Sequence, residues 1–349
     1  MPPSIVLLAE PRGFCAGVEM AIKALTWMVR VFEAPVYCFH EIVHNRWVVK
    51  AFEDVGVVFV DDIDEVPIGS PVMLSAHGSA PEVVSGAESR AGIVVDAVCP
   101  LVTKVHHEVR RMAERGFEII YVGHEGHDEA VGTVAEAPEA ITLVEPETGL
   151  STFDPADPAK VALLAQTTLG VHEWQAVLDD ARRKFPSIST ARKSDLCYAT
   201  TNRQDAVRSL TDEADLILVV GSASSSNTRA LVRVAREAGV NAHRIDDASA
   251  IDPAWLDAAQ VVGVTAGASA PDHLVQEVID RVNPSEGVRL LQITEEGEYF
   301  PLPPQLRTLL RVLQLTVEAG FGAQRQAEPG PLDRDPEWDA TEALAAISR

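Results

Sequence analysis

The stretch IVLLAEPRGFCAGVEMAIKAL, residues 5–25, contains the pattern that decides the fold of this chain. A short apolar segment runs into Cys15, and a helical pattern follows directly. Apolar residues three or four apart place one face of that helix against a core: Val18, Ala21, Ile22, Leu25, Met28 and Val29. The arrangement returns as IVVDAVCPLVTKVHHEVRRMA at 93–113 and ISTARKSDLCYATTNRQDAVRSL at 188–210. Such recurrence indicates a threefold internal repeat.

Each copy continues with two further strands that end in polar loops. The first set of strands is expected at 35–39, 118–122 and 216–220, and the loops after them read HEIVHNR, GHEGHDE and GSASSSN. The second set ends in the loops SAHGSAP (75–81), QTTLG (166–170) and TAGASAP (265–271). Alternating strands and helices predict α/β units with parallel sheets, in which these loops lie at the carboxyl ends of strands.

The serine two residues before proline in both SAP tripeptides predicts a helix N-cap with proline in the first turn. These serines are Ser79 and Ser269.

The repeat predicts three α/β units with boundaries near 95 and 193. We expect units at 1–95, 96–193 and 194–323, and the first strand could pair with the third unit instead of its own copy. The stretch 324–349 is rich in proline and acidic residues and is expected to be a tail, with a short helix near Glu342–Ile347. Three equivalent units could converge on one central point.

Bulk composition excludes several classes of protein. Hydrophobic residues make up 46% of the 349 residues, which is enough for buried cores, and the formal net charge is −23. Such an acidic surface disfavours binding to nucleic acid or to anionic lipid. No apolar stretch is long enough to span a membrane, and no signal peptide is evident, so a soluble cytoplasmic protein is expected.

The cysteines give the sharpest chemical signal. There are four, widely spaced and without a CxxC pair, which argues against a disulfide framework or a zinc knuckle. Cys15, Cys99 and Cys197 occupy equivalent repeat positions, whereas Cys38 lies in an expected strand and is assigned to the core. Three thiolates could hold an iron–sulfur cluster and leave one iron open to substrate. The alternative is that all are ordinary buried cysteines.

The polar loops favour an anionic ligand held by neutral donors. GSASSSN stands between a strand and an apolar helical pattern, where a helix N-terminus offers free N–H groups, although a flexible serine-rich linker is the alternative. His44, His77 and His127 each lie in a loop that ends a strand of the repeat. Glu129 could be a plain helix-start carboxylate or a general acid.

At these residues the sequence resembles the 4-hydroxy-3-methylbut-2-enyl diphosphate reductases of the non-mevalonate isoprenoid route. Nine stretches match in order between residues 11 and 271: PRGFCAGV, EIVHNR, SAHG, CPLVTKVH, GHEGHDE, QTTL, CYATTNRQ, GSASSSN and TAGASAP. The resemblance implies a trefoil of three α/β units around one central [4Fe–4S] cluster, held by Cys15, Cys99 and Cys197. It implies reduction of the hydroxylated allylic diphosphate to isopentenyl and dimethylallyl diphosphate, with two electrons and two protons consumed and water released.

The resemblance also assigns the site residues. The substrate, chiefly its diphosphate, would be bound by His44, His77, Ser225, Ser226, Asn227 and Ser269. His127, Thr167 and Glu129 would lie near its hydroxyl, with Glu129 supplying protons and Thr167 in the relay. The substrate hydroxyl is expected on the open iron, which acts as a Lewis acid.

Three further expectations concern partners and alternatives. PRGFCAG lacks the GxGxxG spacing of a dinucleotide site, so a ferredoxin or flavodoxin is the expected electron donor. The chain is expected to act as a monomer. A non-redox iron–sulfur hydro-lyase is the alternative enzyme, and a redox-sensing metal-binding module is a third possibility that leaves the phosphate-like loops unexplained.

Overall fold

The computed structural model describes residues 3–151, 153–191, 194–317, 319, 332 and 334–347. The chain divides into two compact units, each made of two segments. Unit 1 comprises Met1–Cys15 and Leu101–Gly297, and unit 2 comprises Ala16–Pro100 and Glu298–Arg349. No helix among the described residues is long and apolar enough to cross a membrane.

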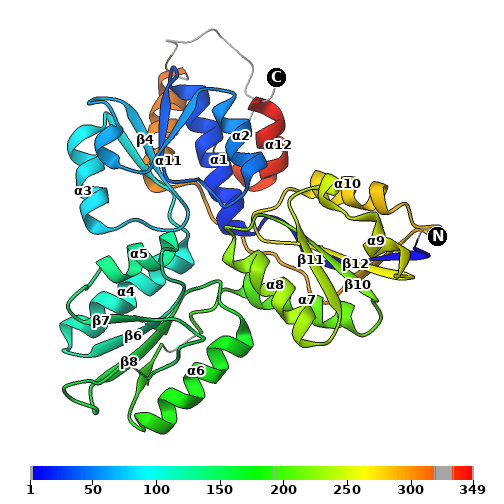
Figure 1. Cartoon of the computed structure of the whole chain (residues 1–349). Helices are drawn as coiled ribbons and strands as arrows, with labels where there is room; N and C mark the ends of the chain where they lie inside the picture. Colours follow the sequence, from blue (N-terminus) through cyan, green and yellow to red (C-terminus); the bar gives the residue numbers. More distant parts are fainter. Residues whose placement is uncertain are drawn as a thin grey trace. The chain divides into compact units, whose positions relative to one another are not determined.

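Unit 2 contains a four-stranded parallel sheet in the order β3-β2-β4-β5. Its strands are β2 (Val36–Phe39), β3 (Val57–Val60), β4 (Pro71–Leu74) and β5 (Ile93–Asp96). Around them lie α1 (Ala16–Val31), α2 (Arg46–Glu53), α3 (Pro81–Arg90), α11 (Pro304–Thr316), α12 (Ala340–Ile347) and the 3₁₀ turns η1 (Ile63–Glu65) and η4 (Asp335–Glu337) (Figure 1). Cys38 is fully buried in β2, as predicted.

Unit 1 contains two parallel sheets. The four-stranded sheet has the order β7-β6-β8-β9, with β6 (Glu118–Val122), β7 (Ile141–Val144), β8 (Val161–Ala165) and β9 (Ser189–Thr190). Its helices are α4 (Pro100–Glu114), α5 (Asp128–Ala135) and α6 (Val171–Lys184). Every residue of β8 is buried, which is the continuous apolar pattern of a strand covered on both faces.

The second sheet of unit 1 has five parallel strands in the order β11-β10-β12-β1-β13. The strands are β1 (Ile5–Glu10), β10 (Leu216–Val220), β11 (Asn241–Ile245), β12 (Val261–Ala266) and β13 (Val288–Gln292), and the helical elements are α7 (Tyr198–Thr211), α8 (Ser226–Glu237), α9 (Pro253–Asp257), α10 (Asp272–Val282) and η2 (Ala248–Ala250). The dark blue β1 lies beside β12 in Figure 1 and pairs with both β12 and β13. The predicted α/β class with three parallel sheets is confirmed.

The domain boundaries near 95 and 193 stay predictions. Residue 193 and most of the expected tail before residue 334 lie outside the described residues. A helix does occupy Ala340–Ile347, where the sequence predicted a short one.

The predicted serine N-caps are wrong. Helix α3 begins at Pro81 with Ala80 as its N-cap, and α10 begins at Asp272 with Pro271 as its N-cap. Neither cap residue offers a side-chain acceptor, because helical geometry begins at or just after the proline instead of one residue before it. Ser79 therefore lies one residue, and Ser269 two residues, too far upstream to cap these helices.

The C-terminal residues from Arg334 onward fold back on α1. Lys23 of α1 forms a buried ion pair with the Asp335 carboxylate, 2.9 Å from Nζ to Oδ1, and both side chains are 4% exposed. The Trp27 and Trp338 rings meet edge to face with their centroids 5.7 Å apart. The Ala340 N–H donates to the Glu19 carboxylate at 2.6 Å, which ties the start of α12 to the same helix.

We predict that Asp335→Ala lowers the free energy of unfolding by about 3–5 kcal/mol, because Lys23 stays buried without its counter-charge. Adding Lys23→Met to that variant should recover part of the loss. Denaturant titration measures both effects. Asp54→Ala removes an exposed ion pair to Lys50 and serves as the control, for which we expect no measurable change. An equally small effect of Asp335→Ala would contradict a stabilising role for this contact.

Candidate active site

All the chemical loops leave the carboxyl ends of parallel strands. The Cys15 loop follows β1, the Cys99 loop follows β5 and the Cys197 loop follows β9. The polar loops predicted from the sequence follow β2, β4, β6, β8, β10 and β12. Each sheet therefore presents its site residues at one edge.

In unit 1 the Cys15 loop lies against the loop after β12. The Gly13 N–H donates to the Ala266 carbonyl at 3.4 Å, and the Cys15 N–H donates to the Ala268 carbonyl at 3.2 Å. Gly13 has a φ of +66°, and a Cβ there would meet the Ala270 carbonyl at 3.2 Å. This close approach explains the glycine two residues before the cysteine and brings Cys15 beside the segment that contains Ser269.

Cys197 caps α7 and contacts the loop after β8. Its Sγ accepts from the Thr200 N–H at 3.2 Å, and its own N–H donates to the Thr167 carbonyl at 3.0 Å. Burial, together with the nearby charge of Cys15, raises the pKa of the Cys197 thiol to about 11. Two thiolates that repel each other suit a shared cation, which would neutralise both.

Glu129, Thr167 and His127 meet at the ends of β6 and β8. The Glu129 carboxylate is 3% exposed and accepts from the Thr167 N–H at 2.6 Å and from the Thr167 hydroxyl at 2.9 Å. His127 caps α5, and its Nδ1 accepts from the Glu129 N–H at 3.2 Å. A ring nitrogen that accepts carries no proton, so this geometry matches a neutral His127.

The Glu129 carboxyl has a pKa that is shifted toward neutral pH. Burial raises its pKa to about 7, the hydrogen bonds from Thr167 lower it, and the charge of Asp195 raises it. Most buried carboxyls without a positive partner behave in this direction. A group that is half protonated near pH 7 can act as a general acid or base under ordinary conditions.

The start of α8 contains buried side-chain atoms that have no hydrogen-bond partner among the described residues. Ser225 caps the helix, and its Oγ accepts from the Thr228 N–H at 3.2 Å. Ser226 and Asn227 are each 3% exposed, yet the Ser226 Oγ and both amide atoms of Asn227 have no hydrogen-bond partner among the described residues. Unpaired buried donors at a helix N-terminus are the arrangement expected of an anion site.

The loop after β12 closes tightly on this helix start. A Cβ on Gly267 would lie 2.1 Å from the Thr228 Oγ1, which no side chain could tolerate. The Gly267 N–H donates to the Val220 carbonyl at 2.9 Å, which joins the ends of β10 and β12. Ser269, 7% exposed, follows two residues later on the same loop.

In unit 2 the predicted residues also come together. The His44 and His77 rings stack with centroids 4.0 Å apart, and His44 Nδ1 lies 3.3 Å from the Glu41 carboxylate. The Cys99 N–H donates to the Ala76 carbonyl at 3.0 Å, directly before His77. The twelve predicted site residues thus form two groups, one at the sheet edge of unit 2 and one at the sheet edges of unit 1.

Sequence reasoning missed the residues that hold the unit 1 loops together. Gln204 is fully buried on α7, accepts from the Val171 N–H at 2.9 Å and donates to the Leu169 carbonyl at 3.1 Å. Arg203 beside it is also fully buried and binds the Cys15 loop. Both belong to the CYATTNRQ stretch, and the signal that could have found them is a charged and an amide residue on the buried face of an amphipathic helix.

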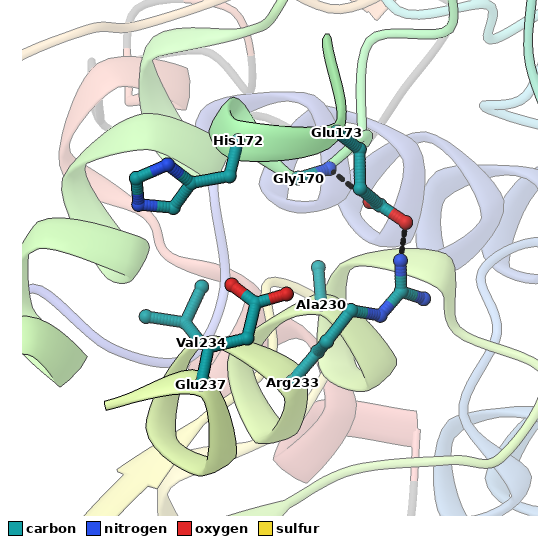
Figure 2. Close-up of a pocket in the computed structure, with 7 residues that line it drawn as sticks. All are labelled: Gly170, His172, Glu173, Ala230, Arg233, Val234 and Glu237. Carbon is teal, nitrogen blue, oxygen red and sulfur yellow. Dashed lines mark hydrogen bonds and ion pairs between the residues drawn. The ribbon is translucent and has the colours of Figure 1, made fainter. Parts of the chain in front are cut away.

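A pocket between α6 and α8 contains none of the predicted residues. It is lined by Gly170, His172, Glu173, Ala230, Arg233, Val234 and Glu237 (Figure 2). Its centre is an ion pair between Arg233 and Glu173, whose carboxylate also accepts from the Gly170 N–H at 2.8 Å. The pocket therefore marks a contact that links the Thr167 loop to α8 rather than a second reactive site.

Comparison with known proteins places the chain in a family. Residues 6–283 match the family described as LytB protein. The 4-hydroxy-3-methylbut-2-enyl diphosphate reductase of Azoarcus sp. is 48% identical over 304 residues, 86% of this chain and 97% of that protein. The reductase of the same name from Streptomyces avermitilis is 47% identical over 329 residues, 93% of this chain and 96% of that protein.

A solved structure agrees. The E-1-hydroxy-2-methyl-but-2-enyl-4-diphosphate reductase of Plasmodium falciparum superposes with a TM-score of 0.86 at 32% identity, covering 90% of this chain and 100% of that one. With a family match across most of the chain and relatives near half identity, the chain belongs to the LytB protein family.

Proposed function

We propose that this chain reduces (E)-4-hydroxy-3-methylbut-2-enyl diphosphate to isopentenyl and dimethylallyl diphosphate. Two electrons and two protons are consumed, the bond between carbon and the hydroxyl oxygen breaks, and the oxygen leaves as water. The observation on which the proposal chiefly rests is the buried Glu129–Thr167 pair, joined to the Cys197 loop by the Cys197 N–H. A proton donor beside a cysteine that can bind metal is what reductive removal of a hydroxyl requires.

One [4Fe–4S] cluster would be held by Cys15, Cys99 and Cys197. None of the three cysteines is in a disulfide, and each follows a parallel strand. The electrostatic repulsion between the Cys15 and Cys197 thiolates is what a shared metal group would relieve. When bound, such a cluster supplies single electrons and, with three protein ligands, one iron open to an oxygen ligand.

The diphosphate would be bound by neutral donors. Ser225, Ser226, Asn227 and Ser269 offer hydroxyl, amide and helix N–H groups in unit 1, and His44 and His77 offer imidazoles in unit 2. The buried atoms of Ser226 and Asn227 that lack a partner among the described residues support this role, because a bound anion would satisfy them.

Glu129 would supply the proton that converts the leaving hydroxyl to water. The Thr167 hydroxyl is hydrogen-bonded to the Glu129 carboxyl at 2.9 Å, so it can take a proton from the acid form of Glu129 while it gives its own to the leaving hydroxyl. His127 would orient the substrate hydroxyl, since its Nδ1 is engaged with the Glu129 N–H and its ring is thereby fixed. These three residues need no large movement to act in sequence.

The electrons would come from a ferredoxin or flavodoxin. Gly13 is accounted for by a close backbone contact, and the glycines around Cys15 lack the spacing of a dinucleotide fingerprint. We further propose a cytoplasmic monomer that acts on a small diphosphate and binds neither nucleic acid nor membrane, in keeping with the net charge of −23.

Anaerobic dye oxidation tests the reaction. A reduced viologen should be oxidised only when protein and the hydroxylated diphosphate are both present, with two electrons consumed per substrate. No oxidation by a sample with an intact cluster would overturn the reductase and favour a non-redox hydro-lyase.

We predict that Glu129→Gln lowers kcat by about 10²- to 10⁴-fold, the usual contribution of a general acid. The amide can keep both contacts to Thr167, so cluster content and substrate affinity should stay unchanged. Steady-state kinetics and iron analysis measure these quantities. Glu125→Gln, on the exposed part of the same loop, is the matched control. Turnover in the Glu129 variant equal to that of the control would remove the proposed proton donor.

The pH dependence of kcat should follow the protonation of Glu129. The acid form of Glu129 is the active one and predominates below its pKa of about 7. We therefore predict that kcat falls about tenfold for each pH unit above that value. The residual kcat of Glu129→Gln should lack this limb, because its amide does not titrate. An alkaline limb that survives unchanged in the variant would assign the titration to another group.

We predict that Asn227→Ala raises KM by about 10- to 100-fold, as loss of a hydrogen bond to a charged group does. Asn227→Asp should raise it further, because its carboxylate repels the diphosphate. Neither change removes a hydrogen bond of the Asn227 side chain within the described part of the chain, so the Tm of the substrate-free alanine variant should not fall. An unchanged KM in both variants would place the diphosphate elsewhere.

A further inference from the structure

Arg203 is the largest side chain that the described part of the protein buries completely. It lies on α7, six residues after Cys197, and faces the interior of unit 1. Burying a guanidinium costs folding free energy unless its N–H donors have acceptors. The contacts of Arg203 therefore indicate its role.

The guanidinium joins the loops of two cysteines. Its Nε and Nη2 donate to the Gly13 carbonyl at 3.2 and 2.8 Å, and Nη2 also lies 3.4 Å from the Phe14 carbonyl. Its Nη1 donates to the Ala199 carbonyl at 3.0 Å, in the first turn after Cys197. One rigid fork therefore holds the residues just before Cys15 and just after Cys197.

Glu296 completes the contact. Its two carboxylate oxygens lie 3.0 and 3.1 Å from Arg203 Nη1, and it also accepts from the Asn202 side chain at 3.0 Å. The carboxylate neutralises the buried charge and fixes the plane of the guanidinium. The fork is thus aimed at the Gly13 and Phe14 carbonyls by a second residue on a different segment.

The Cys15 loop is held through its N–H groups by one segment and through its carbonyls by Arg203. Its N–H groups at Gly13 and Cys15 already bind the Ala266 and Ala268 carbonyls. Its carbonyls at Gly13 and Phe14 point the other way and are bound by Arg203. With both sides held, the loop has one position relative to α7, and the Cys15 and Cys197 thiols come within electrostatic range.

We propose that Arg203 is a positioning residue that sets Cys15 beside Cys197 for cluster binding, with Glu296 orienting it. The proposal rests on the three-cysteine cluster proposed above. Lysine offers one compact ammonium and cannot span both cysteine loops and Glu296 at once. Residues that orient metal ligands in this way usually change metal retention by about 10- to 100-fold when replaced.

The test compares Arg203→Lys, Arg203→Met and Glu296→Gln with wild type after anaerobic loading with iron and sulfide. Arg208→Lys is the matched control, since Arg208 lies on the same helix and pairs only with the neighbouring Asp205 carboxylate among the ion pairs of the described residues. The readouts are iron per chain, the rate of iron loss to a chelator, the electron paramagnetic resonance spectrum of the reduced cluster, and the Tm of the metal-free chain.

We expect Arg203→Lys to lose iron about 10- to 100-fold faster than wild type and to show a changed spectrum, with Glu296→Gln intermediate and Arg208→Lys unchanged. A lysine variant with the wild-type spectrum and rate of iron loss, whatever its Tm, would overturn the proposal and leave Arg203 a structural ion pair. If Arg203→Met does not fold, the lysine and Glu296 variants still decide. Failure of wild type and Arg208→Lys alike to hold a cluster would overturn the cluster assignment, and this proposal with it.

Discussion

The parallel arrangement of every sheet is the constraint on which the site depends. In a parallel sheet all strands end at the same edge, so each loop that follows a strand emerges beside its neighbours. Each sheet presents one cysteine loop and two polar loops on three neighbouring strands, which are β2, β4 and β5 in one sheet, β6, β8 and β9 in the next, and β10, β12 and β1 in the third. The cysteine loop of each sheet comes from a different repeat copy than its two polar loops. The chain thereby gathers residues more than 200 positions apart, such as Cys15 and Ser269, without a long structureless connection.

The proposed anion site would let a strongly acidic chain bind an acidic substrate. The formal net charge is −23, and the side chains proposed to bind the diphosphate in unit 1 are neutral serines and an asparagine. The start of α8 has no acidic residue in its first turn, and the partial positive charge of a helix N-terminus attracts anions most strongly in a buried setting. The buried side chains of Asn227 and Ser226 have atoms without a partner among the described residues, which costs stability that a bound anion would recover.

The fold was predictable from the sequence because its signals are local and repeated. Strands at 118–122 and 216–220 coincide with β6 and β10, since continuous apolar runs between turn residues leave little choice. Strand pairing depends on segments far apart in the sequence and is harder to predict. The pairing of β1 with the third unit was therefore predicted only as one of two possibilities. The predicted N-caps at Ser79 and Ser269 were wrong because a Ser-Ala-Pro pattern does not show a shift of one or two residues in where the helix begins.

The residues proposed to react were easier to predict than the residues that hold them. Histidines and cysteines stand out in loops, whereas Arg203 and Gln204 sit inside a helix where charged residues ordinarily face water. Their hydrogen bonds in the structure show that the two buried side chains bind two different loops. Arg203 binds the Cys15 loop and Gln204 binds the Thr167 loop. Helix α7 is therefore the element through which unit 1 holds the Cys15 loop and the Thr167 loop in one arrangement. Because Cys197 opens the same helix and its N–H donates to the Thr167 carbonyl, α7 positions the Cys197 thiol, the Cys15 loop and the Thr167 loop together.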